Sequence, residues 1–161
     1  MAVNLKWCCS KKEGIGLIEP NDNLSSGYMQ MAENAVGTMN REKNLNVQFA
    51  ISASYYSMYY SLYSVLMKIG VKCEIHTCTL EFMKKLLQDF YSNEDYKIII
   101  KAFDVRQTSQ YYVDRIIAKE DISLIFSKAQ YFLDKSKEVL SQLNERDILK
   151  IRKEIERISN N

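Results

Sequence analysis

Two places in this chain of 161 residues carry side chains whose types and spacing suit chemistry. The first is the polar and aromatic stretch RQTSQYY, residues 106–112, which begins with Arg106. The second is His76, the only histidine of the chain. A guanidinium and an imidazole are groups that can take part in chemistry. Arg106 either contacts an anion or pairs with a group inside the protein, and both interpretations stay open.

Helical spacing decides which of these side chains can act together. Arg106 and Gln110 are four residues apart and share one face of a helix, whereas Tyr111 is turned from Arg106 by about 140°. A site made of Arg106 and Tyr111 therefore needs an irregular turn, or a symmetry-related copy of the chain. In the alternative interpretation, Arg106 is an internal strut that pairs with Asp104, Asp114 or a main-chain carbonyl.

His76 lies in a loop, VKCEIHTCT, between two predicted helices. In the simpler interpretation it caps a helix or anchors the loop. In the alternative it reaches Arg106 and supplies a proton acceptor. Other catalytic signatures are missing, because the sequence has no Gly-rich phosphate loop, no H-E-x-x-H and no recognisable Ser/His/Asp signature. The P-loop and dinucleotide-binding folds are therefore excluded.

The element expected to position both places is a helix from Val47 to Ile69. It holds five of the eleven tyrosines, no acidic residue and a single charge, Lys68. Its apolar and small side chains form two stripes at three- and four-residue spacing, which predicts a helix covered on more than one side. Its serines and tyrosines are too polar for a bilayer. Most of the tyrosines are predicted to lie in the core, but one or two, such as Tyr56 and Tyr60, could stack on a nucleobase beside a cation.

The remaining elements are also helical, so the sequence predicts one all-α domain spanning residues 1–161. The first helix is expected to begin near Asn21, after an irregular segment at 1–20, and further helices are expected at about 79–91, from Ser92 onward and from about 120. Ser92 and Asp95 stand at capping-box spacing. Asn144 marks a break before a charged helical extension, residues 145–161, which packs on the bundle or pairs with another chain.

Composition limits the classes of partner. A formal net charge of +2 is too small to attract nucleic acid or a membrane surface by bulk electrostatics. The four cysteines, Cys8, Cys9, Cys73 and Cys78, lack the paired C-x-x-C pattern of a zinc site, and the first residues carry no signal peptide. We therefore expect reduced thiols, no metal, no membrane contact and a cytoplasmic protein.

Most of the sequence resembles the HEPN domains (higher eukaryotes and prokaryotes nucleotide-binding). LIEPNDNLSSGYMQMAENAV resembles the first helix of that family, and ASYYSMYYSLYSVLMKIGVKCEIHTCTLEFMKKLL resembles its second helix, histidine-containing loop and third helix. FDVRQTSQYYVDR is similar to the signature that follows, and ISLIFSKAQYFLDKSKEVL to the closing helix. The resemblance rests on the order and spacing of these stretches, and is strongest to small stand-alone archaeal and bacterial members.

This resemblance implies an up-and-down bundle of four to six helices that forms a homodimer. Many HEPN proteins are metal-independent ribonucleases with an R-x4-6-H motif, and many are toxins paired with a minimal nucleotidyltransferase. Arg106 matches the motif arginine, but Tyr111 stands at the shortest spacing for the histidine, and no histidine follows Arg106. A tyrosine with an ordinary pKa of ~10 is a poor base at neutral pH, so the motif is degenerate.

The resemblance therefore favours a nucleotide- or RNA-binding module that acts with a nucleotidyltransferase-type partner in a toxin–antitoxin-like pair. Two alternatives stay open: a metal-independent endoribonuclease that uses Arg106 with Tyr111 or His76, and a non-catalytic dimeric interaction module. No cofactor is expected. The residues expected to bind a nucleotide or RNA are Arg106, Gln107, Gln110, Tyr112, Tyr56 and Tyr60.

Overall fold

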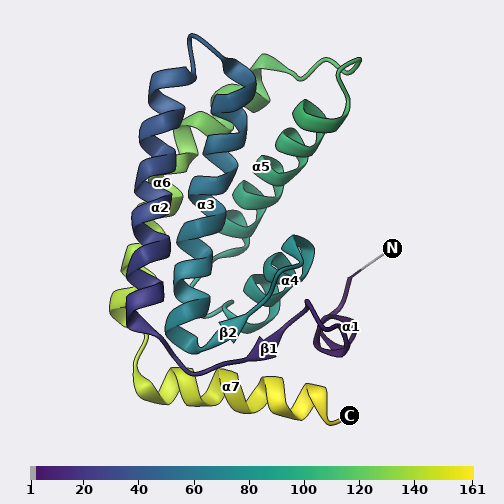
Figure 1. The fold of residues 1–161 in the computed structure, drawn as a ribbon, viewed down its shortest axis with the longest axis vertical. Helices are drawn as coiled ribbons and strands as arrows, with labels where there is room; N and C mark the ends of the chain where they lie inside the picture. Colours follow the sequence, from purple (N-terminus) through teal and green to yellow (C-terminus); the bar gives the residue numbers. More distant parts are fainter. Residues whose placement is uncertain (1–2) are drawn as a thin grey trace.

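The computed structural model describes residues 3–161 and contains seven helices and two short strands in that range. Helices α2, α3, α5 and α6 lie side by side along the long axis, α7 crosses one end of them, and α1 and α4 lie beside that end (Figure 1). The predicted all-α bundle is confirmed. The elements are α1 (Leu5–Ser10), β1 (Gly16–Leu17), α2 (Asp22–Glu42), α3 (Val47–Ile69), β2 (Val71–Lys72), α4 (His76–Leu86), α5 (Asn93–Tyr111), α6 (Lys119–Gln142) and α7 (Glu145–Ser159).

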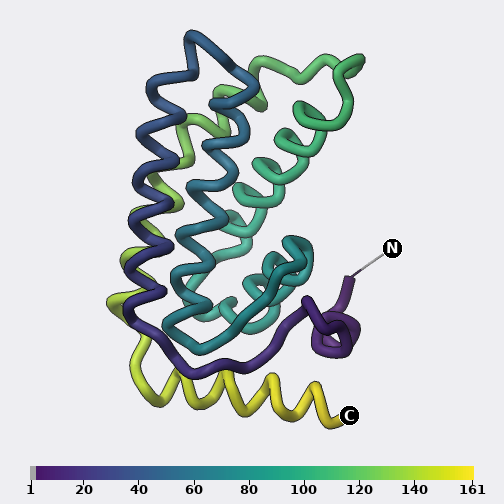
Figure 2. Tube along the Cα trace, in the orientation of Figure 1, coloured from purple at the N-terminus to yellow at the C-terminus, as the bar shows by residue number. Residues whose placement is uncertain are grey.

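Helix α3 is the centre of the bundle and packs against α2, α5 and α6 (Figure 2). It begins and ends where the sequence predicts. The side chain of Asn46 accepts a hydrogen bond from the backbone N–H of Phe49 at 3.2 Å, and Gly70 ends the helix at a φ of 86°. Most of its side chains are buried, although Phe49 is 65% exposed because the first turn projects at the end of the bundle. Beyond this first turn, α3 is buried on more than one side, as its two apolar stripes predict.

The N-terminal segment differs from the irregular chain that was predicted for residues 1–20. Asn4 caps α1 by accepting a hydrogen bond from the N–H of Trp7 at 2.9 Å. Strand β1 then pairs antiparallel with β2, with Gly16 opposite Lys72. A six-residue helix and a two-residue strand are too short to give a periodic signal, so their stability comes from contacts with distant parts of the chain.

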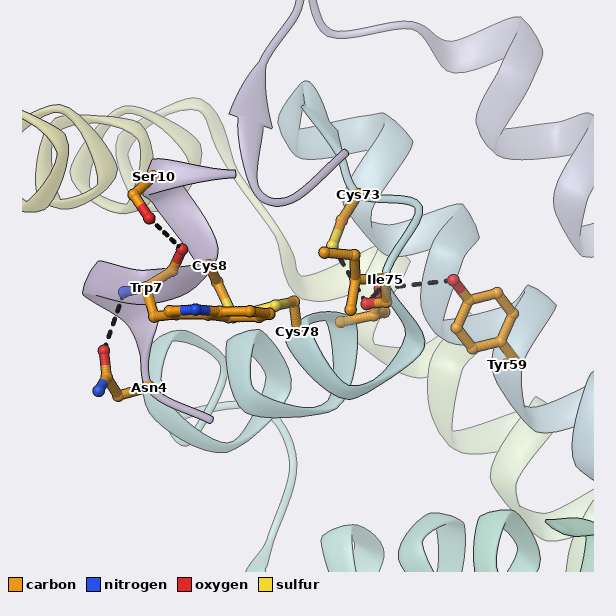
Figure 3. Close-up of a disulfide and its surroundings, with 9 residues drawn as sticks. Asn4, Trp7, Cys8, Ser10, Tyr59, Cys73, Ile75 and Cys78 are labelled. Atoms are coloured by element: carbon orange, nitrogen blue, oxygen red, sulfur yellow. Dashed lines mark hydrogen bonds between the residues drawn. A yellow bond between two sulfur atoms is a disulfide. The ribbon is translucent and has the colours of Figure 1, made fainter. Parts of the chain in front are cut away.

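The prediction that all four cysteines are reduced thiols is wrong. Cys8 in α1 and Cys78 in α4 form a disulfide, with their Cα atoms 5.6 Å apart (Figure 3). Cys9 and Cys73 are free thiols. The bond forms because α1 packs on α4 and brings the two backbones to a separation that a disulfide spans. The start of α4, which carries His76, is therefore tied to the N-terminal helix.

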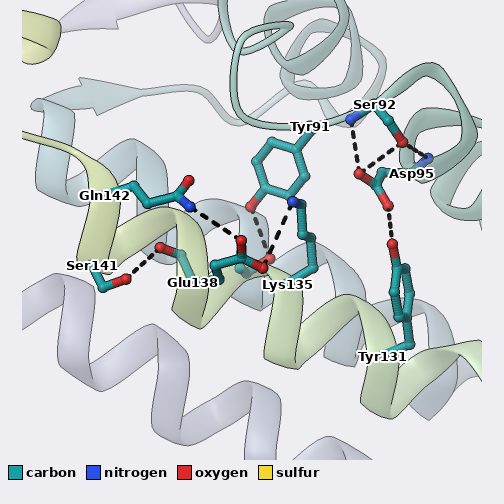
Figure 4. A network of polar contacts seen from close by, with 9 residues as sticks. Tyr91, Ser92, Asp95, Tyr131, Lys135, Glu138, Ser141 and Gln142 are labelled. Atoms are coloured by element: carbon teal, nitrogen blue, oxygen red, sulfur yellow. Dashed lines mark hydrogen bonds and ion pairs between the residues drawn. The ribbon is translucent and has the colours of Figure 1, made fainter.

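Helix α4 also differs from its predicted range of 79–91, since it begins earlier and ends at Leu86. Leu87 and Tyr91, both buried, follow in a turn that leads to the predicted capping box. In that box the Ser92 hydroxyl accepts from the N–H of Asp95, and the Asp95 carboxylate accepts from the N–H of Ser92. Tyr131 of α6 donates to the same carboxylate at 2.7 Å, which joins the start of α5 to α6 (Figure 4).

The C-terminal extension packs on the bundle as helix α7, one of the two roles expected for it. Asn144 caps it in a second capping box, with Asp147, and Ile151 and Ile155 are buried. Nη1 of Arg152 lies 2.8 Å from the carbonyl of Ile18 and 2.9 Å from that of Gly70. This guanidinium joins α7 to the end of α3. No helix within residues 3–161 has an apolar stretch long enough to cross a membrane.

Candidate functional site

The two places singled out in the sequence meet in one open pocket of about 490 Å³. Its lining side chains come from α3, from the start of α4 and the residue before it, and from the last turns of α5. The lining residues are Tyr56, Ile75, His76, Thr77, Phe103, Arg106, Gln107 and Tyr111. His76 and Arg106 thus line the same pocket, as the alternative interpretation of His76 requires.

Arg106 lies at the back of the pocket, and its side chain is only 6% exposed. Its Nη1 donates to Oε1 of Gln110 at 3.0 Å, and its Nη2 donates to Oε1 of Gln107 at 3.3 Å. The guanidinium lies over the rings of Tyr55 and Tyr56, with its central carbon 4.7 and 5.6 Å from the two centroids. Among residues 3–161 its buried Nε has no hydrogen-bond partner, and no carboxylate pairs with the guanidinium. Amide oxygens and aromatic faces therefore surround this charge.

In residues 3–161 Arg106 pairs with none of the partners named for an internal strut, since its hydrogen bonds go to Gln107 and Gln110 and not to Asp104, Asp114 or a main-chain carbonyl. A buried charge without a counterion is unfavourable, since its lost hydration is repaid only in part by neutral acceptors. Cation–π contacts add about 0.5–2 kcal/mol of attraction. An anion bound in the pocket would supply the missing charge, so this arrangement is suited to a phosphate or a carboxylate.

His76 is the first residue of α4 and lines the same pocket as Arg106. It is not the cap of that helix, because Ile75 occupies the N-cap position. Its Nδ1 lies 2.8 Å from the hydroxyl of Tyr55, and its ring stacks on Tyr59 with a centroid distance of 4.1 Å. Burial, and after it the positive charge of Arg106, hold the pKa of His76 below its ordinary value. His76 is thus anchored, and it is neutral at neutral pH.

The geometry expected for α5 is confirmed at Gln110, which shares a face with Arg106 and accepts its hydrogen bond. Tyr111 is the last residue of α5 and is 63% exposed. It nevertheless lines the same pocket as Arg106, at the rim. Arg106 and Tyr111 therefore line one pocket although they lie on different faces of the helix, with Arg106 buried and Tyr111 exposed.

Three of the six expected binding residues do not line the pocket: Gln110, Tyr112 and Tyr60. Gln110 nevertheless contacts Arg106 through a hydrogen bond. Tyr112 lines a different groove, in which the guanidinium of Arg115 lies 3.8 Å from its ring centroid. Tyr60 does not line the pocket and packs instead against Tyr28, at a centroid distance of 6.1 Å. Tyr56 and Gln107 do line it. The pocket therefore brings together Arg106, Gln107, Tyr56, Tyr111 and His76, and Gln110 contacts Arg106 beside it.

Two participants were missed as site residues in the sequence. Tyr55 is fully buried and touches both His76 and Arg106, and the ring centroid of Phe103 lies 5.7 Å from the Arg106 guanidinium. Phe103 is three residues before Arg106, so helical spacing alone could have indicated that contact. Nothing in the spacing indicates Tyr55. In the part of the chain that the structure describes, no cluster of potential ligands fits a metal ion.

Comparison with known proteins identifies two archaeal relatives. The first, "Putative toxin MJ0142" of Methanocaldococcus jannaschii, is 30% identical over 98 residues, which cover 60% of this chain and 67% of that protein. The chain belongs to the family of that archaeal protein. The second, a "UPF0332 protein" of Archaeoglobus fulgidus, is 24% identical over 92 residues, or 56% of this chain and 74% of the relative. No family model matches the chain.

The printed name of the M. jannaschii relative, "Putative toxin MJ0142", agrees with the toxin-like part of the expected function. That name states neither the molecule on which the relative acts nor its partner. What the pocket of the present family member binds must therefore be argued from its own residues.

Proposed function

We propose that this protein is a toxin-like HEPN module that binds RNA or a nucleotide phosphate in the pocket of Arg106. One observation carries the proposal: a guanidinium that is 6% exposed lines an open pocket without a carboxylate partner in the described chain. A ribose-phosphate brings the negative charge that this group lacks. Tyr56 and Phe103, which also line the pocket, offer ring faces on which a base can stack.

The proposal extends to two partners. A second copy of the chain is supported by exposed apolar side chains at two connections between helices: Leu45 and Phe49 where α2 leads into α3, and Val113 and Ile116 between α5 and α6. Exposed apolar groups favour association when a partner covers them. The other partner is a small nucleotidyltransferase, as the family resemblance implies. The mass of the purified protein by light scattering tests the homodimer.

A second candidate function is metal-independent RNA cleavage, and the position of His76 in the Arg106 pocket favours it. In such a reaction Arg106 would stabilise the phosphate while a second group takes the proton of the 2′-hydroxyl. The lowered pKa of His76 keeps its ring neutral, as a general base requires. Tyr111 is the other group at the rim.

Single-stranded RNA is expected to bind the wild-type protein in EDTA, and Arg106→Ala is expected to weaken that binding by about 10- to 100-fold. A hydrogen bond to a charged group contributes about 1.5–3 kcal/mol, which sets this range. Fluorescence anisotropy with a labelled oligonucleotide measures the binding, and gel analysis of the same samples detects cleavage. Cleavage that disappears with Arg106 would favour the endoribonuclease.

Arg115→Ala is the matched control. Arg115 also lies over an aromatic ring on the same helical end, but in the separate groove of Tyr112. Its removal is expected to change RNA binding by less than about threefold, as for a surface charge. Equal losses in the two variants would contradict a specific site at Arg106. Circular dichroism of both variants checks that each remains folded.

A further inference from the structure

The contact between Tyr55 and His76 determines which atom of the imidazole can meet a ligand. The hydroxyl of Tyr55 lies 2.8 Å from Nδ1 of His76. Tyr55 is fully buried, and its hydroxyl has no other hydrogen-bond partner in residues 3–161. Burial also raises the pKa of the Tyr55 phenol far above its ordinary value, so the phenol keeps its proton. A buried O–H that donated to nothing would be unfavourable. The O–H of Tyr55 therefore donates to Nδ1.

A neutral imidazole carries one hydrogen, and a ring that accepts at Nδ1 carries it on Nε2. Nε2 of His76 has no hydrogen-bond partner in the described chain. It is not one of the buried polar atoms that lack a partner, so solvent can reach it. Its side chain lines the pocket that Arg106 also lines. The ring therefore offers the pocket an N–H donor, and the lone pair that a general base needs is occupied at Nδ1.

We propose that Tyr55 is a positioning residue that holds His76 as an Nε2–H donor, so that His76 and Arg106 contact the same phosphate group of RNA. This inference rests on the proposed binding function and adds a second phosphate contact to it. It also separates the two candidate functions, because a ring fixed in this tautomer binds phosphate but does not accept the proton of the 2′-hydroxyl at Nε2.

The surroundings of His76 agree with a neutral ring. The phenols of Tyr55, Tyr56 and Tyr59 face it from α3, and the guanidinium of Arg106 faces it from α5. Tyr111 stands at the rim of the same pocket. Burial and the nearby positive charge both favour the neutral form. A hydrogen bond donated to Nδ1 favours it too, so removing the Tyr55 hydroxyl should raise the pKa of His76.

Nuclear magnetic resonance tests the tautomer directly, because His76 is the only histidine of the chain. In ¹⁵N-labelled protein without a histidine tag, long-range ¹H–¹⁵N spectra should show an unprotonated Nδ1 and a protonated Nε2 at neutral pH.

Tyr55→Phe should raise the pKa of His76 by about half a unit to one unit. Tyr59→Phe is the matched control, since the Tyr59 ring stacks on His76 while its hydroxyl lies 3.4 Å from Thr79. It should leave the pKa nearly unchanged. A proton on Nδ1 in the wild-type protein would overturn the inference.

RNA binding provides the second readout. His76→Gln keeps an N–H donor near the place of Nε2 and should bind RNA within about threefold of wild type, whereas His76→Ala should bind about tenfold more weakly. Equal loss in both variants, or no loss in either, would contradict a donor role for His76. A different result would contradict the proposed function itself: Arg106→Ala that binds RNA as tightly as wild type. If the wild-type protein has the expected tautomer but binds no RNA, Tyr55 only anchors the His76 ring, and the shared phosphate contact is overturned.

Discussion

Arg152→Ala is expected to lower the free energy of unfolding by about 2–4 kcal/mol, although Arg152 is far from the pocket. Its Nη1 donates to the carbonyls of Ile18, Ile69 and Gly70 at 2.8, 3.2 and 2.9 Å. Two of these acceptors lie at the C-terminal end of α3, where a positive charge also favours the helix dipole. A charge-assisted hydrogen bond contributes about 1.5–3 kcal/mol, and alanine leaves all three carbonyls without this donor. Urea denaturation measures the change.

Arg157→Ala is the control for this prediction because it lies on the same helix. Arg157 pairs with Glu154 on the surface, with its side chain 63% exposed, so its removal should lower the free energy of unfolding far less than Arg152→Ala does. If the two variants are equally destabilised, the arginines of α7 stabilise the fold through their charge alone and not through the hydrogen bonds of Arg152. A change below about 0.5 kcal/mol for Arg152→Ala would contradict its role in joining α7 to α3.

The central helix was predictable because its signals are local. Asn46 caps the start, Gly70 ends the helix at a φ of 86°, and the two apolar stripes lie between them. The same holds for Ser92 and Asn144, which open α5 and α7 through capping boxes. Helix α4 carries no such signal, because its N-cap, Ile75, makes no side-chain hydrogen bond. Its limits are set by packing with α1 and by the disulfide, and the sequence pattern contains neither.

The candidate site was predictable in its parts but not in its assembly. The sequence singled out Arg106 and His76, and the spacing of Gln110 from Arg106 correctly predicted that these two share one face of a helix, where they form a hydrogen bond. That His76 shares the pocket depends on where α4 begins relative to α3, and this is a tertiary contact. Tyr112 was expected at the site because it follows Tyr111. It lies in another groove because α5 ends at Tyr111, and the chain turns away there.

Cleavage and binding make different demands on the same pocket. Binding needs donors and positive charge, which Arg106 and the Nε2–H of His76 supply. Cleavage also needs a group that accepts a proton, and Tyr55 turns the lone pair of His76 away from the pocket. The absence of a histidine after Arg106 and the Tyr55 contact thus favour the same outcome. The proposed site is suited to phosphate recognition more than to cleavage.

Loss of the disulfide is expected to lower the free energy of unfolding by about 2–5 kcal/mol. The bond joins Cys8 to Cys78 across a sequence separation of 70 residues, so it removes many conformations from the unfolded chain. Chemical denaturation with and without a phosphine reductant measures the difference. Thiol titration should find two reactive thiols per unfolded oxidised chain, Cys9 and Cys73, and four after reduction.

Two cysteine variants make this test specific. Cys8→Ser should reproduce the loss seen with reductant and should no longer respond to it, whereas Cys9→Ser should keep the full response. A wild-type protein whose stability is the same under both conditions would contradict a structural role for the bond. Because Cys78 lies two residues after His76 in α4, reduction also frees the wall of the pocket that carries the imidazole. The resonances of His76 should therefore shift or broaden in the reduced protein, which would connect the N-terminal helix to the state of the phosphate site.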